Sequence, residues 1–108
     1  MEGQHKDEGK PRFDLIPVAP LTEIAKVLTE GANKKYSDNN WALGVNYSRY
    51  YSSLQRHLNA FWGGKGTDPE FGLHHLAHAG CCLLFLLYYE LNRKKYETFD
   101  DRLEKEKP

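Results

Sequence analysis

The feature that most constrains the fold is a long apolar stretch in the C-terminal half of the chain. Residues 80–89 read Gly-Cys-Cys-Leu-Leu-Phe-Leu-Leu-Tyr-Tyr, and no Asp, Glu, Lys or Arg occurs between Glu70 and Glu90. A helix that is apolar on all sides has to be covered on all sides. A chain of 108 residues forms one domain with one core, so its other helices leave part of this one uncovered. We therefore expect an all-α bundle that is completed by oligomerisation, as a dimer or a tetramer.

Apolar residues at helical spacing predict three main helices, over residues 21–35, 48–62 and 68–96. The second is expected to end at two glycines. The third is expected to begin with Asp68-Pro69-Glu70, a combination typical of an N-cap and a first helical turn. Residues 11–20 contain three prolines, which predict an extended segment packed against the bundle. The expected organisation is a flexible arm over residues 1–10, a helical domain over 11–96 and a charged tail over 97–108, without strands.

Charge and hydropathy argue against two classes of partner. Lys and Arg together number 15, and so do Asp and Glu. The chain therefore lacks the net positive charge that draws proteins to nucleic acid polymers or membrane surfaces. Its longest apolar run is too short to cross a bilayer, and its first residues are not an apolar signal region. Adjacent cysteines on a helix cannot pair without strain, so Cys81 and Cys82 are expected to be reduced core residues of a cytoplasmic protein.

Histidines gather where the third helix is expected to start. His74, His75 and His78 are close together, Glu70 lies one turn earlier, and His57 is on the preceding helix. Residues three or four apart share a helix face, and imidazoles with a carboxylate are a sound ligand set for a divalent metal. The alternative for each histidine is a helix cap or a hydrogen bond within a polar layer. Four histidines together favour a ligand or metal site.

Cationic and aromatic residues elsewhere suit a ligand that carries phosphates and a base. The side chains of Arg12, Lys35 and Arg56 have the charge to bind phosphate, although surface solvation explains a single lysine equally well. Trp41 follows Asn40 in a loop rich in turn residues, where it could stack on a base while the amide binds the base edge. A tryptophan that fills the core is the alternative, and the sequence does not separate the two.

Several ordered blocks of the chain resemble a known family. They are Lys10-Pro-Arg-Phe-Asp-Leu-Ile-Pro17, Gly31-Ala32, Lys35-Tyr36, Asn40-Trp41, Arg56-His57-Leu58, Asp68-Pro-Glu70, Gly72-Leu73 and His75-Leu-Ala-His-Ala79. Over residues 9–90 the chain resembles the small phage dATP/dGTP diphosphohydrolases, which are grouped with the MazG-like all-α nucleotide pyrophosphohydrolases. The resemblance implies an oligomeric helical bundle that binds a divalent metal and cuts a deoxynucleoside triphosphate to the monophosphate and pyrophosphate.

The metal residues differ from the pattern of that superfamily. The superfamily has a Glu-Glu-x-x-Glu helix followed by a Glu-x-x-Asp helix, whereas the corresponding helices here carry Arg56-His57 and His75-Leu-Ala-His78. Because Mg²⁺ prefers oxygen ligands and imidazole suits zinc and other transition metals, the substitution disfavours magnesium. Carboxylates are scarce near these histidines, and the nearest in the sequence are those of Asp68 and Glu70.

The first hypothesis is therefore a phage-type pyrophosphohydrolase that acts on a purine (deoxy)nucleoside triphosphate in the cytoplasm of the host cell. Glu70, His75 and His78 are expected to bind the divalent metal, which would be manganese, magnesium or zinc. The expected catalytic residues are His57, Glu70 and His78, with His57 serving as a fourth ligand or a proton-transfer group. The expected substrate-binding residues are Arg12, Lys35, Tyr36, Asn40, Trp41, Arg56 and His74.

Two further hypotheses belong to other classes of protein. The first is a non-catalytic sponge that sequesters a nucleotide signal of the host immune response, which the scarcity of carboxylates favours. Lys65, where relatives are expected to carry an acid, points the same way. The second is a helical adaptor domain without a small ligand, which accounts for the apolar helix and leaves the histidines unexplained.

Overall fold

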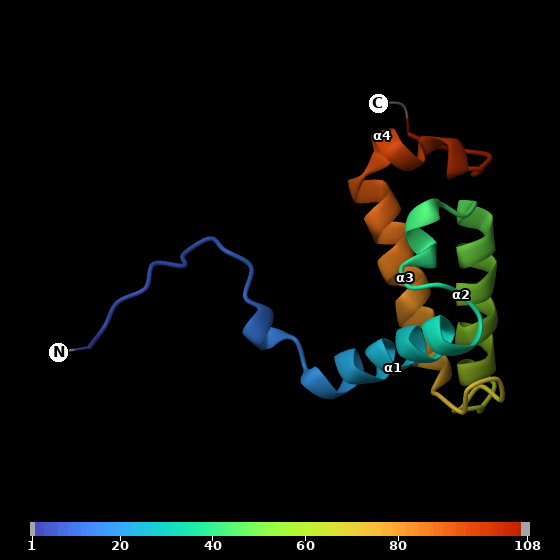
Figure 1. The fold of residues 1–108 in the computed structure, drawn as a ribbon, viewed down its shortest axis with the longest axis horizontal. Helices are drawn as coiled ribbons and strands as arrows, with labels where there is room; N and C mark the ends of the chain where they lie inside the picture. The colour runs from blue at the N-terminus through green and yellow to red at the C-terminus, as the bar shows by residue number, and fades with distance from the viewer. Residues whose placement is uncertain (1, 107–108) are drawn as a thin grey trace.

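The computed structural model describes residues 2–106 and is all-α, which confirms the expected fold class (Figure 1). Its helices are α1 (Val18–Lys34), α2 (Tyr47–Trp62), α3 (His75–Leu91) and the short α4 (Arg93–Tyr96). Three 3₁₀ turns accompany them, η1 (Phe13–Leu15), η2 (Asn40–Leu43) and η3 (Glu97–Phe99). Within the described residues there is no strand, only an isolated bridge between Thr67 and His74. None of the helices in residues 2–106 has the length and apolar character needed to span a membrane.

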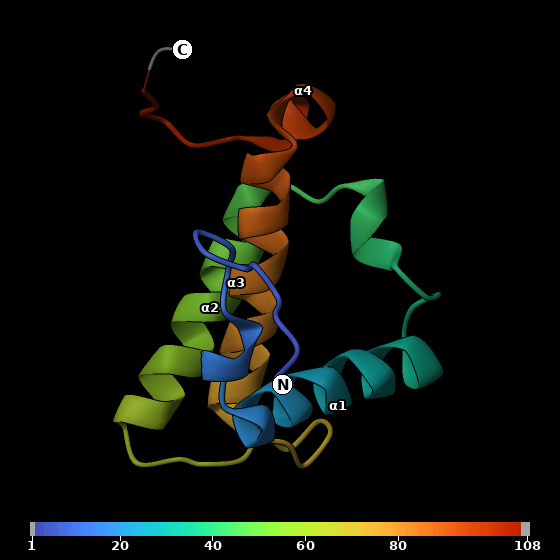
Figure 2. The same cartoon turned by 90° about the vertical axis from the view of Figure 1, so that its left-hand side faces the viewer.

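The core lies along α3, which packs against both other long helices. α2 and α3 run antiparallel, and α1 crosses near the start of α3 (Figures 1 and 2). Small buried residues of α3, among them Ala77, Ala79 and Cys82, allow this close approach. At the crossing with α1, a Cβ added to Gly80 would lie 2.7 Å from Cδ1 of Ile24. The absence of a side chain at residue 80 therefore lets α1 rest directly on α3.

Buried tyrosines attach the connection between α1 and α2 to the far end of α3. Tyr89 and Tyr96 are the largest fully buried side chains. The Tyr89 hydroxyl donates to the carbonyl of Trp41 at 2.6 Å, and the Tyr96 hydroxyl donates to that of Ala42 at 2.7 Å. Each hydroxyl thus satisfies a carbonyl of η2, as buried polar groups require. Gly44 has φ 101° and contacts the Phe99 ring, so any side chain there would be both strained and obstructed.

The third helix begins later and ends earlier than residues 68–96, the range expected from the sequence. Asp68-Pro69-Glu70 belongs to a loop instead, because the Asp68 carboxylate accepts from the Glu70 amide at 2.8 Å in a local turn. The helix starts at His75, whose amide donates to the Gly66 carbonyl. At the other end Asn92, with φ −123° and ψ 46°, separates α3 from α4.

The proline segment, residues 11–20, does not pack against the bundle as expected. All ten of its residues are exposed, and the chain before α1 extends away from the helices (Figure 1). α1 begins three residues earlier than expected, at Val18, because Pro17 is its N-cap and Pro20 falls in the first turn, where proline is tolerated. This extension of α1 carries the preceding residues outward.

Part of the expected charged tail packs against the body. The side chain of Asp100 is 1% exposed and accepts from Arg102 at 2.8 Å and from Arg93 at 3.1 Å. The neighbouring Asp101 carboxylate accepts from the Ser48 amide at 2.9 Å, which supplies a partner to the first turn of α2. Residues 100 and 101 therefore clamp α4 to the start of α2.

We expect Asp100→Ala to lower the free energy of unfolding by about 2 kcal/mol, because it removes charge-assisted hydrogen bonds from a buried acceptor. The loss of stability should not be larger, because the half-exposed side chains of Arg93 and Arg102 can form hydrogen bonds with water once Asp100 is removed. Hydrogen bonds from Arg102, and then from Arg93, hold the pKa of Asp100 below its ordinary 3.8. The stabilisation is therefore complete above that pH and declines as the pH falls below it. Urea unfolding measures both effects, and Glu104→Ala, on an exposed residue of the same segment, should change stability by less than about 0.5 kcal/mol.

Candidate metal and nucleotide site

Three side chains from separate elements meet at the end of the bundle where α2 ends and α3 begins. Nδ1 of His57 lies 2.9 Å from Nδ1 of His75. Oδ2 of Asp68 lies 3.7 Å from each of these nitrogens. His75 is buried, and the other two are largely so. Two imidazoles and one carboxylate are thus brought within the span of a single ion.

The local structure of the chain fixes this group, which we call the His57–Asp68–His75 triangle. His57 is on α2, and His75 is the first residue of α3. Asp68 sits in the intervening loop, where its amide donates to the Leu73 carbonyl at 2.8 Å and its carbonyl accepts from Gly72 at 2.9 Å. Because Oδ1 of Asp68 already accepts from the Glu70 amide, Oδ2 is the oxygen turned toward the histidines.

The dimensions of the triangle suit a metal. Ligand atoms about 2.0–2.1 Å from a tetrahedral Zn²⁺ are separated from one another by about 3.4 Å. Distances of 2.9, 3.7 and 3.7 Å between the three donor atoms bracket that value. Without an ion, the histidine pair is a hydrogen bond whose donor depends on the tautomer. Three protein ligands leave a further position for water or substrate, as in catalytic zinc sites.

Burial favours the neutral form of His57 and of the neighbouring His78. It lowers the pKa of His57 below its ordinary 6.5, and the neighbouring His78 lowers it further, while Asp68 opposes the change. Burial is likewise the largest cause of a lowered pKa at His78. Metal ligation requires a neutral imidazole. Both rings are therefore neutral at pH 7.

His78 stands beside the triangle and is not one of its three members. Its ring stacks on His57, with centroids 4.6 Å apart and planes 12° apart, and on Phe71 at 5.9 Å. Its Nε2 is buried without a hydrogen-bond partner among the described residues. His78 thus packs on the His57 ring and is not among the three side chains whose donor atoms converge.

Glu70, the other expected metal ligand, makes an ion pair instead. Its carboxylate lies 2.8 Å from Nζ of Lys35, and both side chains are roughly half-exposed. The hydrogen bond to Glu70 is the first cause of the raised pKa of Lys35, and the charge of Asp68 adds to it. His74 is the N-cap of α3, and its side chain accepts a hydrogen bond from the Leu76 amide at 3.0 Å. His74 is therefore a helix cap, the alternative to a ligand role.

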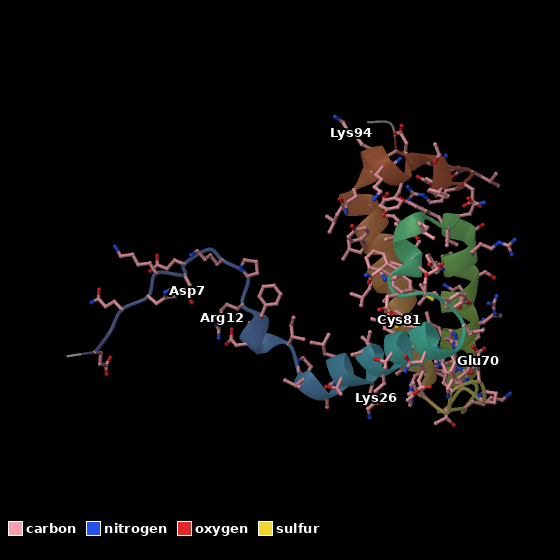
Figure 3. The ribbon with its side chains drawn as sticks, viewed as in Figure 1. Asp7, Arg12, Lys26, Glu70, Cys81 and Lys94 are labelled. Carbon is pink, nitrogen blue, oxygen red and sulfur yellow. The ribbon has the colours of Figure 1, made fainter. Side chains whose placement is uncertain are left out.

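Other expected site residues lie at differing distances from the triangle. Arg56 is exposed and close enough for its charge to lower the His57 pKa. Tyr36 is exposed beside Lys35, whose Nζ lies 5.8 Å from the ring centroid. Arg12 pairs with Asp14 on the segment that leaves the body, well away from Glu70 (Figure 3).

Trp41 and Asn40 are in η2, at the opposite end of α3. The Trp41 ring stacks on Phe85 with centroids 5.6 Å apart and meets Tyr88 edge-on at 4.7 Å. Trp41 therefore fills the core, as the alternative to base stacking predicts.

Asp68 is the member of the triangle that the sequence did not assign to the metal. Its signal was its place before a proline in a turn-rich stretch close to the histidines.

The buried histidines predict a loss of stability in mild acid, measured in the presence of a chelator. The pKa values of His57 and His78 lie below 6.5 in the fold, so the unfolded chain binds more protons than the native one as the pH falls below 6.5. Each group then contributes a slope of up to about 1.4 kcal/mol per pH unit. His78→Phe retains the stacked ring and should flatten this pH dependence. His5→Gln, in the exposed N-terminal residues, should leave it unchanged, and an unchanged slope in His78→Phe would contradict the assignment.

Comparison with known proteins supports the likeness seen in the sequence blocks. The family model described as dATP/dGTP diphosphohydrolase, N-terminal, matches residues 1–102. Over 102 residues the chain is 36% identical to a dATP/dGTP diphosphohydrolase of Salmonella phage PMBT28, an alignment that covers 94% of this chain and 33% of that protein. The chain thus spans about a third of the length of this relative. No solved structure matches. The chain belongs to the dATP/dGTP diphosphohydrolase N-terminal family.

Proposed function

We propose that this chain supplies the nucleotide-binding and metal-binding part of a diphosphohydrolase. Its substrate is a purine deoxynucleoside triphosphate, and its products are the monophosphate and pyrophosphate. The His57–Asp68–His75 triangle is the observation that carries this proposal. The name of the phage relative agrees with the substrate class.

The triangle fits manganese or zinc better than magnesium, because two of its three donors are imidazole nitrogens. A divalent cation held there would supply positive charge to phosphate oxygens and lower the pKa of a bound water. His57, Asp68 and His75 are its proposed ligands. His57, predicted from the sequence to be catalytic, is thus proposed as a metal ligand. His78 would hold the His57 ring in place by stacking on it.

Two cations flank the triangle and are the proposed phosphate-binding residues. Arg56 and Lys35 are both electrostatically coupled to members of the triangle. The guanidinium of Arg56 donates to Ser52 at 2.9 Å and is otherwise turned to the exposed side of α2. Guanidinium and ammonium groups in such positions neutralise the charge of a triphosphate. The exposed ring of Tyr36, beside Lys35, is the proposed surface for the base.

Glu70 is the proposed general base. It is two residues from Asp68 and is held by Lys35 at 2.8 Å. A triphosphate that draws Lys35 to its own oxygens would release the Glu70 carboxylate to accept a proton from the attacking water. Substrate binding and base activation would then be coupled through this one ion pair.

We further propose that the active form is an assembly of several copies of the chain in the host cytoplasm.

Loss of a triangle residue should abolish turnover without unfolding the protein. We expect His57→Ala and Asp68→Asn to lower kcat/KM for dGTP or dATP by at least about 100-fold, since ligand loss exceeds the 10–100-fold effect of disturbing residues around a metal. Chromatographic separation of nucleotide products in the presence of Mn²⁺ measures this, and circular dichroism checks the fold. His5→Ala is the matched control and should retain full activity. Normal turnover in His57→Ala would refute the assignment.

Metal binding provides a readout that does not depend on turnover. Titration of the metal-free protein with Co²⁺, followed by visible absorption, should give one site per chain with a low coordination number. Asp68→Asn should weaken this site, whereas His74→Gln, which changes only the cap of α3, should leave the spectrum unchanged. Equal spectra for the unmodified protein and Asp68→Asn would rule out the triangle as the site.

Sequestration without cleavage is the second candidate function, and one observation favours it. The triangle contains a single carboxylate, and the next one, Glu70, is already paired with Lys35. A site of this kind retains its attraction for phosphate when hydrolysis is lost. Incubation with a nucleotide, followed by heat release, separates the two functions. Intact nucleotide identifies a sponge that captures a host immune signal, and recovered monophosphate identifies the hydrolase.

A further inference from the structure

One face of α3 carries exposed leucines along its whole length. Its members, which we call the leucine stripe, are Leu76, Leu83, Leu84, Leu87 and Leu91. Their spacings of seven, one, three and four residues place them on one side of a helix. Four of the five are between 41% and 57% exposed and Leu91 is 76% exposed. α1 crosses this side of α3 at Gly80, where a Cβ would meet Ile24, and it borders Leu76 through Pro20 and Ile24.

The proline segment carries a second apolar surface. Phe13, Leu15 and Val18 are 77%, 68% and 74% exposed, and Ile16 is 45% exposed. In Figure 1 the segment leaves the body on the side of α3, and Figure 2, viewed from that side, shows it in front of the helices. The proline segment therefore extends from the body on the side of α3. Within residues 2–106, the members of both surfaces remain at least 41% exposed.

The surface area of the chain quantifies what is left uncovered. Its accessible surface is 8860 Å², whereas a compact monomer of 12.5 kDa exposes about 6,200 Å². Its radius of gyration is 17.0 Å, compared with about 13 Å for a compact domain of this length. The excess is roughly 2,700 Å² per chain, or about 5,400 Å² over two chains, and it includes the exposed residues 2–17. It lies at the upper end of permanent homodimer interfaces, which bury about 2,000–5,000 Å² or more over both partners.

We propose that a second copy of this chain covers the leucine stripe, with its own stripe and proline segment. A copy fits better than an unrelated partner because one sequence holds both apolar surfaces, so that a two-fold arrangement covers both in both chains. The formal net charge of zero removes long-range repulsion between copies. This inference names the interface of the assembly included in the proposed function, and does not depend on catalysis.

The interface adjoins the metal site at one end. A pocket of about 270 Å³ lies where α1 crosses α3, and its lining is mostly apolar, with Pro20, Ile24, Leu76, Glu23, His74 and Ala77 around it. Leu76 belongs to the stripe, and His74 precedes the ligand His75. A chain seated on the stripe therefore reaches the first turn of α3. Association should accordingly restrain the residues that hold the triangle.

Sedimentation equilibrium on the unmodified protein tests the proposal directly. We expect a mass of twice 12.5 kDa or a higher multiple. The double variant Leu83→Glu/Leu87→Glu should weaken association at least about 100-fold, because it places charges in an apolar contact. Leu15→Glu should weaken it in the same direction. Leu103→Glu is the matched control, since Leu103 is fully exposed outside both surfaces, and it should associate normally.

Hydrogen exchange on the unmodified protein covers the case in which the double variant fails to fold. Raising the protein concentration should slow exchange in residues 12–16 and on α3, and leave residues 103–106 unaffected. A monomer at all concentrations would overturn the proposal, as would protection confined to other surfaces. Retained association in a folded Leu83→Glu/Leu87→Glu variant would overturn it as well. None of these measurements uses enzymatic activity. A negative result would therefore contradict the proposed interface and leave the proposed hydrolase function untouched.

Discussion

The close approach of α3 to its two neighbours is the contact on which the rest of the structure depends. Ala77 and Cys81 face α1, while Ala79 and Cys82 face α2, and Gly80 meets Ile24 without a side chain of its own. Because small residues set the distances between helix axes, the first turn of α3 is held against the last turns of α2. The 2.9 Å contact between His57 and His75 follows from this packing. Larger residues in α3 would separate the histidines before they disturbed either helix.

The loop over residues 63–74 turns a histidine pair into a three-donor group. Gly64 and Gly72 have φ values of 95° and 70°, conformations that L side chains rarely adopt. They permit the turns that follow α2 and precede α3, and Asp68 lies between them. The hydrogen bonds of Asp68 with Leu73, Gly72 and Glu70 then fix its carboxylate. Side chains from two packed helices and a braced turn are thus held in place by the protein itself, as a preorganised metal site would require.

The sequence predicts the helices better than it predicts the residues between them. Periodicity located α2 to within one residue and identified α3 as the central helix, because both signals arise from burial on the helix itself. The start of α3 was wrong, since Asp68-Pro69-Glu70 fits a helix N-terminus and an Asp-initiated turn equally well. Gly72 was the discriminating signal, because it lies where a first helical turn would have to continue. Trp41 could not be placed from its neighbours, because its partners Phe85 and Tyr88 are more than forty residues away.

In the proposed site, charge would make phosphate binding more robust than cleavage. One carboxylate and two imidazole ligands would leave a bound divalent cation with a net charge of about +1, to which Lys35 and Arg56 would add. A carboxylate-rich site would instead neutralise its cation and rely on the metal's own coordination of the substrate. Attraction for a polyanion would thus be set by residues that do not react. In the proposed mechanism, cleavage would depend on the Lys35–Glu70 pair, which the negative charge of the substrate would have to open. On this proposal, a change at Glu70 would remove cleavage while the histidines and cations kept the attraction for phosphate.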